Sequence, residues 1–402
     1  MTDEEDSPIP EARTEAPKAA RPSWLTDAYP EFRPGPPWVM EEMMASEPDL
    51  VMPILSNPAA VNVARMILAA HQSGQPIVTT GCGTSEHGAL AIATLVEAGL
   101  SVVAAPGGRV ECRQAFDQWL EPRARGVLVA VSHDGGTAAT VAAIKAARSA
   151  GATTVLITAR ADAPAGRVAD HLLVTPQIDR SWCHTVAYMS SILAGAALAG
   201  AVCGENLHSK DLRDFLHQIE TGKKQASEVA HALADCSRLI ITGLGADLIS
   251  ARELALKIEE GARLPAVAMH LETLLHGHLA ATDARTGMVF VLCAKPGSQR
   301  RDLRARLAAA AAGRIGIRCA AILAVQTDFL ETLTNAGRIV LPPEESDRGG
   351  IEALAFALAG SAVALQQLAL ALAHERGSNP DLIRREQEPY REAARIAEQG
   401  TW

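Results

Sequence analysis

Aromatic residues are scarce in this chain: Phe, Trp and Tyr together make up only 3% of its 402 residues. Hydrophobic residues still amount to 48%, so the cores must be filled mainly by Ala, Leu and Val. A chain of this length can form two domains of ordinary size. The composition is therefore typical of a globular protein with ample core material.

Positive charge is also in deficit, because the formal net charge is −9. Without a basic field nothing offsets the repulsion between protein and phosphate backbone, which argues against a general nucleic-acid binder. The densest basic run, RRDLRAR at 300–306, is more simply explained as an amphipathic surface helix. No nucleic-acid partner is expected.

Paired cysteines are absent as well. The seven cysteines are odd in number, scattered along the chain and never spaced as CxxC. This pattern argues against a disulfide framework and against a zinc site. The start of the chain lacks the basic residues and apolar segment of an export signal. We therefore expect reduced thiols, no bound metal and a cytoplasmic protein.

Two charge-free runs, 185–204 and 353–373, reach the length of a membrane span. Both are Ala-rich, both contain a polar pair (two serines in the first run, two glutamines in the second), and neither has aromatic belts at its ends. We therefore expect buried helices and no membrane partner.

The same order of segments occurs twice in the chain. An apolar run, a Gly-rich turn and a helical pattern are followed by a second apolar run with a polar turn, and then by a third run. The corresponding pairs are 77–97 with 239–260, 127–137 with 288–299, and 151–162 with 316–328. Short apolar runs that each precede a helical pattern predict parallel strands covered by helices. We expect an α/β fold with two pseudo-symmetric three-layer αβα lobes, and ligands at the carboxyl ends of the strands.

Composition shifts set the expected boundaries. Residues 1–37 hold eight prolines and an acidic start, so they cannot bury enough apolar surface to offset their ordering entropy and are expected to be disordered. The remaining parts are a first lobe at 38–204, a charged helical connector at 205–235, a second lobe at 236–373 and a C-terminal tail at 374–402.

Two turns of the first lobe carry hydroxyl side chains. GCGTSEHG at 81–88 and SHDGGT at 132–137 each lie between a predicted strand and a predicted helix. Helix N-termini favour anions, so Thr84, Ser85, Ser132 and Thr137 could converge on one anion. The alternative is that residues such as Ser132, Asp134 and Thr137 only cap turns and helices.

In the second lobe, Glu253, Lys257 and Glu260 have the spacing i, i+4 and i+7, which places two carboxylates and an ammonium on one helix face. A solvated salt-bridged face would show the same spacing. The preceding glycine turn at 243–247, and the nearby His270, His276 and His278, favour a functional site.

These segments resemble the tandem sugar-isomerase (SIS) domain family, and within it the isomerase half of the glucosamine-fructose-6-phosphate synthases. GCGTS at 81–85 matches the family's first phosphate loop, and SHDGGT at 132–137 corresponds to its S-Q-S-G-E-T loop. ELALKIEE at 253–260 aligns with the family's EGALKLKE, and LHGH at 275–278 keeps the spacing to its K-H-G-P. The resemblance covers about residues 38–400.

The resemblance implies roles for ten positions. It implies that the substrate is a sugar phosphate, that Glu260 is the acid/base between C1 and C2, and that the site is shared between the subunits of a homodimer. The residues at phosphate-binding positions of the family are Ser85, Ser132, His133, Asp134 and Thr137, with Thr84 beside them. His276 corresponds to the histidine that opens the sugar ring from the partner subunit. Lys257 and Glu253 correspond to residues that frame the catalytic site. Isomerisation through an enediol(amine) needs one carboxylate and neither cofactor nor metal.

The chain departs from the family pattern at several positions. The family's glutaminase cysteine stands directly after the initiator Met, whereas Thr2 follows Met1 here, so we expect no use of glutamine as the ammonia source within this chain. Asp134 replaces a phosphate-binding serine, as in the related fructosamine-6-phosphate deglycases, which must accommodate an amine. Leu275 and His278 replace the Lys and Pro around His276.

The C-terminal region also differs. Residues 374–402 contain no lysine where the family has a catalytic one, and Arg384 and Arg385 are the nearest cations. In a third loop, at 176–185, His184 and Thr185 are either substrate contacts or a core histidine beside a helix cap.

The sequence therefore predicts an aldose–ketose isomerase for an amino-sugar phosphate, with loss of the amine as an accompanying step. A fructosamine-6-phosphate deglycase is the alternative enzyme. A non-catalytic sugar-phosphate-binding regulator is the alternative from another class, although a sensor would need neither Glu260, Lys257 nor His276.

Overall fold

The computed structural model describes residues 29–103, 108–294, 299–327, 329, 331–343 and 350–398. Most of the expected disordered tail, residues 1–28, lies outside this range. Residues 29–38 contain neither helix nor strand.

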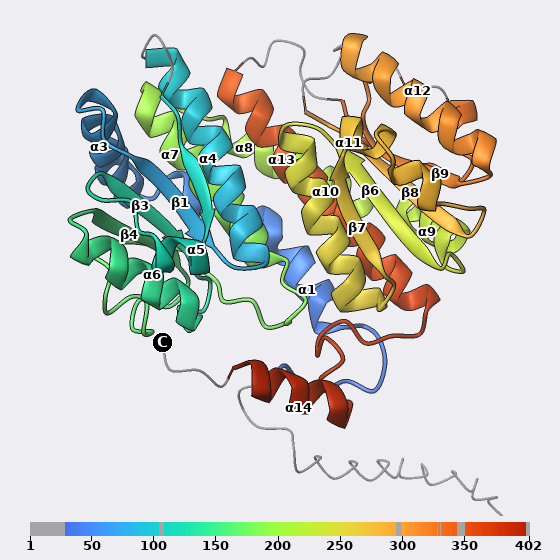
Figure 1. Cartoon of the computed structure of the whole chain (residues 1–402), viewed down its shortest axis with the longest axis horizontal. Coiled ribbons are helices and arrows are strands. Elements are labelled where there is room, and N and C mark those ends of the chain that lie inside the picture. Colours follow the sequence, from blue (N-terminus) through green and yellow to red (C-terminus); the bar gives the residue numbers. More distant parts are fainter. Residues whose placement is uncertain are drawn as a thin grey trace, which may run out of the picture.

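The first lobe is built on a five-stranded parallel sheet in the order β2-β1-β3-β4-β5 (Figure 1). Its strands are β1 Ile77–Gly81, β2 Glu111–Gln114, β3 Val127–Val131, β4 Thr153–Thr158 and β5 His171–Val174. Strands β1 and β3 are buried along their whole length, which is why they appear in the sequence as unbroken apolar runs.

The second lobe repeats this topology. Its parallel sheet has the order β10-β9-β8-β6-β7, with strands β6 Arg238–Gly243, β7 Ala266–His270, β8 Thr286–Leu292, β9 Arg318–Ala324 and β10 Arg338–Leu341. Counted along the chain, both sheets run second, first, third, fourth, fifth. The predicted two-lobed parallel α/β architecture is confirmed. All six predicted strands are present, and they are the three inner strands of each sheet.

Helices cover both faces of each sheet. Their bounds are α1 Val39–Ser46, η1 Glu47–Leu50, α2 Val51–Leu55, α3 Ala59–Gln72, α4 Thr84–Val103, α5 Ala115–Leu120, α6 Ala138–Ser149, α7 Val186–Cys203, α8 Ser209–Thr221, α9 Lys223–Leu233, α10 Ala246–Lys257, η2 Ile258–Ala262, α11 Leu271–Leu275, η3 His278–Ala281, α12 Gln299–Ile315, η4 Glu331–Leu333, α13 Gly350–Glu375 and α14 Glu388–Ala397. Helices α4, α7, α10 and α13 pack together between the two sheets, so one large core spans both lobes.

The two charge-free runs form α7 and α13. Together with α4, they are the three helices in the described ranges that individually have the length and hydropathy of a membrane span. The most hydrophobic windows of α7 and α13 are 89% buried inside the protein. Their apolar surface is therefore used by the core between the lobes, as predicted.

Glycine allows the closest helix contact in this core. A Cβ added to Gly99 of α4 would lie 2.8 Å from the carbonyl oxygen of Ala199 in α7, and one added to Gly88 would lie 2.5 Å from the Cβ of Ser191. The backbones of α4 and α7 can approach only because these side chains are missing. The Gly88 contact lies near the start of both helices, and Ser85 of α4 and Ala187 of α7 in these starts line the cavity described below.

Candidate functional site

A cavity of about 330 Å³ lies at the carboxyl ends of β1 and β3. Segments far apart in the sequence line it: the turn after β1, the turn after β3, the loop before α7, the π-helix η2 and the segment before α14. Its lining residues are Cys82, Gly83, Thr84, Ser85, His133, Asp134, Thr137, Trp182, His184, Ala187, Glu260, Ile383, Arg385 and Glu398. The structure thus brings six of the ten predicted site residues into one cavity.

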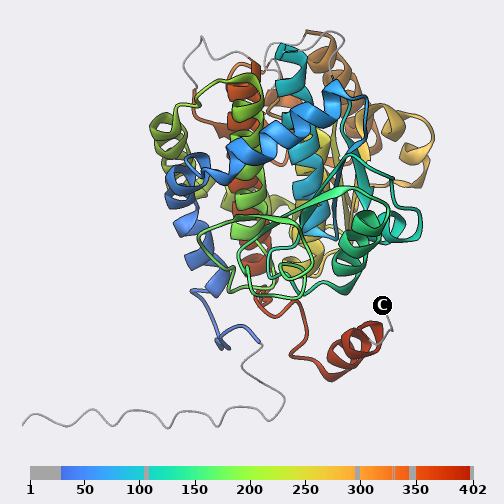
Figure 2. The same cartoon turned by 90° about the vertical axis from the view of Figure 1, so that its left-hand side faces the viewer.

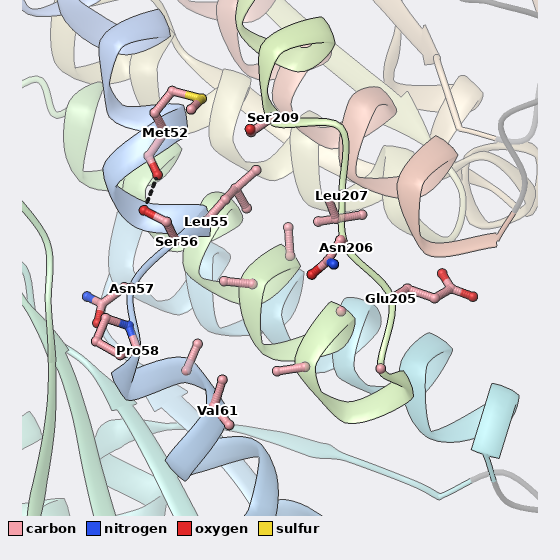
Figure 3. Close-up of a pocket in the computed structure, with 16 residues that line it drawn as sticks. Met52, Leu55, Ser56, Asn57, Pro58, Val61, Glu205, Asn206, Leu207 and Ser209 are labelled. Carbon is pink, nitrogen blue, oxygen red and sulfur yellow. Dashed lines mark hydrogen bonds between the residues drawn. The ribbon is translucent and has the colours of Figure 1, made fainter.

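A larger cavity, of about 510 Å³, lies at the opposite end of α7 (Figure 3). It is lined by the α2–α3 connection, the Ala-rich C-terminal half of α7 and the segment 204–209. None of the predicted site residues is among its described lining residues, so size alone does not identify the site.

The turn after β1 is shaped by two glycines. A Cβ at Gly81 would lie 2.4 Å from the carbonyl oxygen of Ser85, and Gly83 has a φ of +56°. The chain can therefore pass directly from β1 into α4, whose positive dipole end meets the cavity. Ser85 lines the cavity, whereas the Thr84 hydroxyl is directed elsewhere and donates a hydrogen bond to Oε1 of Glu253 at 3.1 Å.

The turn after β3 contains a neutral histidine. Nε2 of the buried His133 accepts a hydrogen bond from the backbone N–H of Asp179 at 2.7 Å. Burial lowers the pKa of His133 from 6.5 to about 4. At neutral pH, His133 is therefore uncharged, and its ring proton is on Nδ1 because Nε2 accepts the hydrogen bond.

The sequence left open whether the side chains of this turn contact a ligand or only cap the turn and the helix. The remaining side chains differ in this respect. The Asp134 carboxylate accepts from the backbone N–H of Gly136 at 2.9 Å, so it caps the turn, while it also lines the cavity. Thr137 occupies the N-cap position of α6 without a side-chain cap bond. The Ser132 hydroxyl is buried and has no hydrogen-bond partner among the described residues; Ser132 lies behind the lining residues.

The loop before α7 is organised by Asp179. Its buried carboxylate accepts from the backbone N–H groups of Ser181 and Thr185, at 3.1 and 2.7 Å. Burial acts to raise the pKa of Asp179, but His184, His133 and the backbone donors lower it overall. Nδ1 of His184 lies 3.7 Å from Oδ2 of Asp179. His184 lines the cavity, whereas Thr185 is buried behind it.

Glu260 stands where a helix changes its geometry. Helix α10 ends at Lys257 and continues as the π-helix η2, a feature that often occurs at functional sites. The partly exposed Glu260 carboxylate is paired with Nζ of Lys257 and lines the cavity. Lys257 is fully buried; burial acts to lower its pKa, but Glu260 and Glu253 raise it overall. The cavity wall therefore carries one carboxylate backed by a permanent ammonium.

Glu253 lies on the other side of this ammonium, and its side chain is 1% exposed. Its Oε1 is 3.6 Å from Nζ of Lys257, and its Oε2 is 2.6 Å from Nδ1 of His87. Burial acts to raise the pKa of Glu253, but Lys257, His87 and Thr84 lower it overall. Since Thr84 and His87 belong to α4 of the first lobe, Glu253 joins the lobes. Glu253 therefore bridges Lys257 and α4 and is not among the described cavity-lining residues.

His276 lies outside the cavity of its own chain. Its side chain is 70% exposed, and Nε2 is 2.9 Å from Oε1 of Glu272. The expected entry of His276 into a partner's site stays a prediction. In the part of the chain that the structure describes, no group of three or more His, Cys, Asp or Glu side chains is arranged to hold a metal ion.

A SIS domain model matches residues 71–202, which span the first lobe from the end of α3 to the end of α7. This match includes both turns of the cavity. The chain carries a SIS domain.

The relatives extend the likeness of the SIS domain to both lobes. The isomerizing glutamine–fructose-6-phosphate aminotransferase of Pyrobaculum aerophilum is 28% identical over 337 residues, which are 81% of this chain and 52% of that protein. The C-terminal domain of glucosamine-fructose-6-phosphate aminotransferase from Francisella tularensis has a TM-score of 0.70 at 18% identity, covering 87% of this chain and 99% of that chain. Tagatose-6-phosphate ketose/aldose isomerase from Escherichia coli has a TM-score of 0.69 at 21% identity, covering 88% and 98%.

The chain spans between 34% and 52% of the length of the curated relatives it matches. The similar structures share the two-lobed fold formed by both lobes of this chain.

The second lobe repeats the SIS topology with a closed turn. Asp247 stands where the first lobe has Ser85, and its Oδ1 accepts from the backbone N–H groups of Cys293 and Ala294, at 2.9 and 2.7 Å. Burial raises its pKa to about 7. Oδ2 lies 3.6 Å from the guanidinium of Arg301. In the second lobe, a carboxyl group of the protein itself thus occupies the turn whose counterpart in the first lobe faces the cavity.

The SIS site also includes residues that sequence reasoning did not single out. His87 follows the GCGTS motif, but its partner Glu253 is 166 positions away, so no local pattern marks it. Trp182 and Ile383 line the cavity; Trp182 lies in the third loop already noted, whereas Ile383 carries no signal. Of the two cations noted in the C-terminal region, Arg384 and Arg385, Arg385 is the one among the described lining residues of the cavity.

We predict that Glu253→Gln destabilises the protein by roughly 3 kcal/mol, because it removes one partner of a buried ion pair and a cross-lobe acceptor while keeping the side-chain shape. The matched control is Glu272→Gln, which removes an exposed carboxylate of the second lobe that pairs with Arg304 and His276; its free energy of unfolding should fall by no more than about 1 kcal/mol. Urea unfolding at neutral pH measures both. Equal stability of the two variants would show that the Glu253 cluster does not hold the lobes.

Proposed function

We propose that this protein is a sugar-phosphate isomerase that acts on an amino-sugar phosphate in the cytoplasm. The observation that carries the proposal is the Glu260 carboxylate on the cavity wall, paired with the buried Lys257 ammonium, in a cavity that the Ser85 and Thr137 turns also line. The similarity to an isomerizing fructose-6-phosphate aminotransferase and to a ketose/aldose isomerase supports the same class of substrate.

In the proposed reaction the turns after β1 and β3 hold the phosphate, and Glu260 removes a proton from the carbon next to the carbonyl group. The electrons of the broken C–H bond form the C=C bond of the enediol(amine) while the carbonyl oxygen gains a proton. Glu260 then returns its proton to the former carbonyl carbon, and the heteroatom on the other carbon loses one to become the new C=O or C=N group. Lys257 offsets negative charge in this part of the site. Isomerisation of a 2-amino aldose phosphate leaves a C=N bond at C2, and addition of water to that bond would release the amine, as ammonia or an amino compound, and leave the ketose phosphate.

We expect Glu260→Gln to lower catalysis by about 10²–10⁴-fold while leaving ligand binding largely intact, because it removes the base and keeps the shape. Solvent-deuterium exchange into C1 or C2 of bound fructose 6-phosphate or glucosamine 6-phosphate is the measurement. The control is Glu259→Gln in the same π turn, where an exposed carboxylate accepts from the backbone N–H of Ala266. Undiminished exchange in the Glu260 variant would remove this residue from the mechanism.

We also propose a homodimer in which His276 completes the partner's site by opening the sugar ring. Its exposed position beside Glu272, away from its own cavity, is compatible with this role. Imidazole can both donate and accept a proton, which suits the proton transfers of ring opening.

If the site is shared, mixing inactive Glu260→Gln and His276→Ala protomers should restore part of the activity, because one hybrid site regains both groups. The assay is isomerase activity after verified subunit exchange, with each variant alone as the control. Absence of recovery would place both groups in one chain's site or give one of them a structural role.

A fructosamine-6-phosphate deglycase is the second candidate, and Asp134 is the observation that favours it. This carboxylate lines the cavity within the proposed phosphate-binding turn after β3, where it would repel a phosphate but could pair with a substrate amine.

Asp134→Ser separates the two enzymes. If Asp134 pairs with an amine, the change should weaken binding of fructosamine 6-phosphates by about 1–3 kcal/mol, the range for a lost charged hydrogen bond, and leave simple hexose 6-phosphates little changed. Tighter binding of simple hexose 6-phosphates would instead identify Asp134 as an unfavourable neighbour of the phosphate. Calorimetric titration with both ligand classes measures the difference, and equal effects would leave Asp134 as a turn cap only.

A further inference from the structure

The charges around the cavity do not favour an anion. Its described lining residues include three carboxylates, those of Asp134, Glu260 and Glu398, and a single Arg or Lys side chain, Arg385. The charge of Glu260 is offset by Lys257. A phosphate entering this cavity therefore meets two further carboxylates, and Arg385 is the permanent cation available to it.

Arg385 is held firmly in place. Its guanidinium lies over the ring of Trp182, 4.8 Å from the ring centroid, a favourable cation–π contact. The segment that carries Arg385 is anchored to the rest of the site, because the buried Asp381 accepts from the backbone N–H groups of Val39 and Met40 and its carbonyl oxygen accepts from the N–H of Trp182.

The backbone leading to Arg385 is strained. Ile383 and Arg384 have φ angles of +41° and +66°, a conformation that non-glycine and especially β-branched residues rarely adopt. Such strain persists only where the surroundings enforce it, and it is common at ligand clamps. The hydroxyl of Ser378 also binds the carbonyl oxygen of Gly261 in the π-helix, at 2.7 Å, so the segment is fixed directly against the turn that carries Glu260.

The guanidinium of Arg385 already has an anionic partner. Oε1 of Glu398 lies 3.3 Å from it, with the Glu398 side chain 68% exposed. Glu398 follows α14, a helix with no buried residues that lies outside the body of the molecule in both views (Figures 1 and 2). Of the three cavity carboxylates, Glu398 is thus the one on an element with no part in the core.

We propose that Arg385 binds the anionic group of the ligand and that Glu398 is an internal competitor, which pairs with Arg385 in the empty cavity and leaves when the ligand binds. The identity of the anion as the phosphate of a sugar phosphate rests on the proposed function. Displacement of Glu398 removes one negative charge from the cavity as the phosphate adds its own, and it releases the end of α14.

Calorimetric titration of the full chain with fructose 6-phosphate and with inorganic phosphate tests this. Glu398→Gln should bind both anions about two- to fivefold more tightly, the range that corresponds to loss of a partly exposed ion pair. The control on the same helix is Glu392→Gln, whose carboxylate pairs with Arg395 and is not among the cavity-lining residues; it should bind as the wild type does. Arg385→Gln should bind about 10- to 100-fold more weakly, with partial recovery in Arg385→Lys.

Hydrogen exchange gives a second readout that does not depend on catalysis. Amides of α14 in the wild type should exchange faster when fructose 6-phosphate is bound, and in Glu398→Gln they should already be fast without it. Unchanged or slower exchange on binding, or equal affinities for Glu398→Gln and Glu392→Gln, would overturn the competitor role. Wild-type affinity in Arg385→Gln, or no binding of either anion by the wild type, would overturn the role of Arg385.

The outcomes for the proposed function are separate. If the wild type binds both anions but exchanges no deuterium into bound sugar phosphates, the isomerase proposal fails and the roles of Arg385 and Glu398 stand. If exchange occurs and Glu398→Gln binds no more tightly than the wild type, only the competitor role fails.

Discussion

The buried ammonium of Lys257 is the charge around which the site is arranged. An ion taken out of water is tolerated only if counter-charges surround it, and here these are Glu253 on one side and Glu260 on the other. The Glu253 carboxylate joins the two lobes through its contacts with α4, and the Glu260 carboxylate lines the cavity. The same side chain therefore links the stability of the fold to the position of the group proposed to move protons.

The two lobes show how one topology can have two different ends. Both sheets have the same strand order, and both first turns place a helix start at the carboxyl edge. The second residue of this helix is Ser85 in the first lobe, where it lines the cavity. Its counterpart in the second lobe is Asp247, which accepts hydrogen bonds from the backbone N–H groups of Cys293 and Ala294. At this position a hydroxyl side chain accompanies a turn that faces a cavity, and a carboxyl side chain accompanies a turn that is filled by the protein's own hydrogen bonds.

Much of the fold could be predicted because its inner strands are buried on both faces and so form continuous apolar runs. The outer strands could not: Glu111–Gln114 is only half-buried and His171–Val174 is largely exposed, so neither has an apolar run of useful length. Turn chemistry located Ser85 and Thr137, and helical spacing located Glu253, Lys257 and Glu260. The pairing of Glu253 with His87, the π-helical turn at Glu260 and the approach of Arg385 to Trp182 depend on contacts between distant segments, which local patterns do not record.

The contact of Glu253 with Thr84 and His87 has a consequence for how a ligand can enter. Many two-lobed binding proteins close by swinging one lobe against the other about a hinge. Here a charge cluster shielded from water pins helix α10 to helix α4 directly behind the cavity, so a swing would have to pull apart buried partners. Access to this site must be governed by its rim, and binding should proceed with the two sheets moving as one rigid frame.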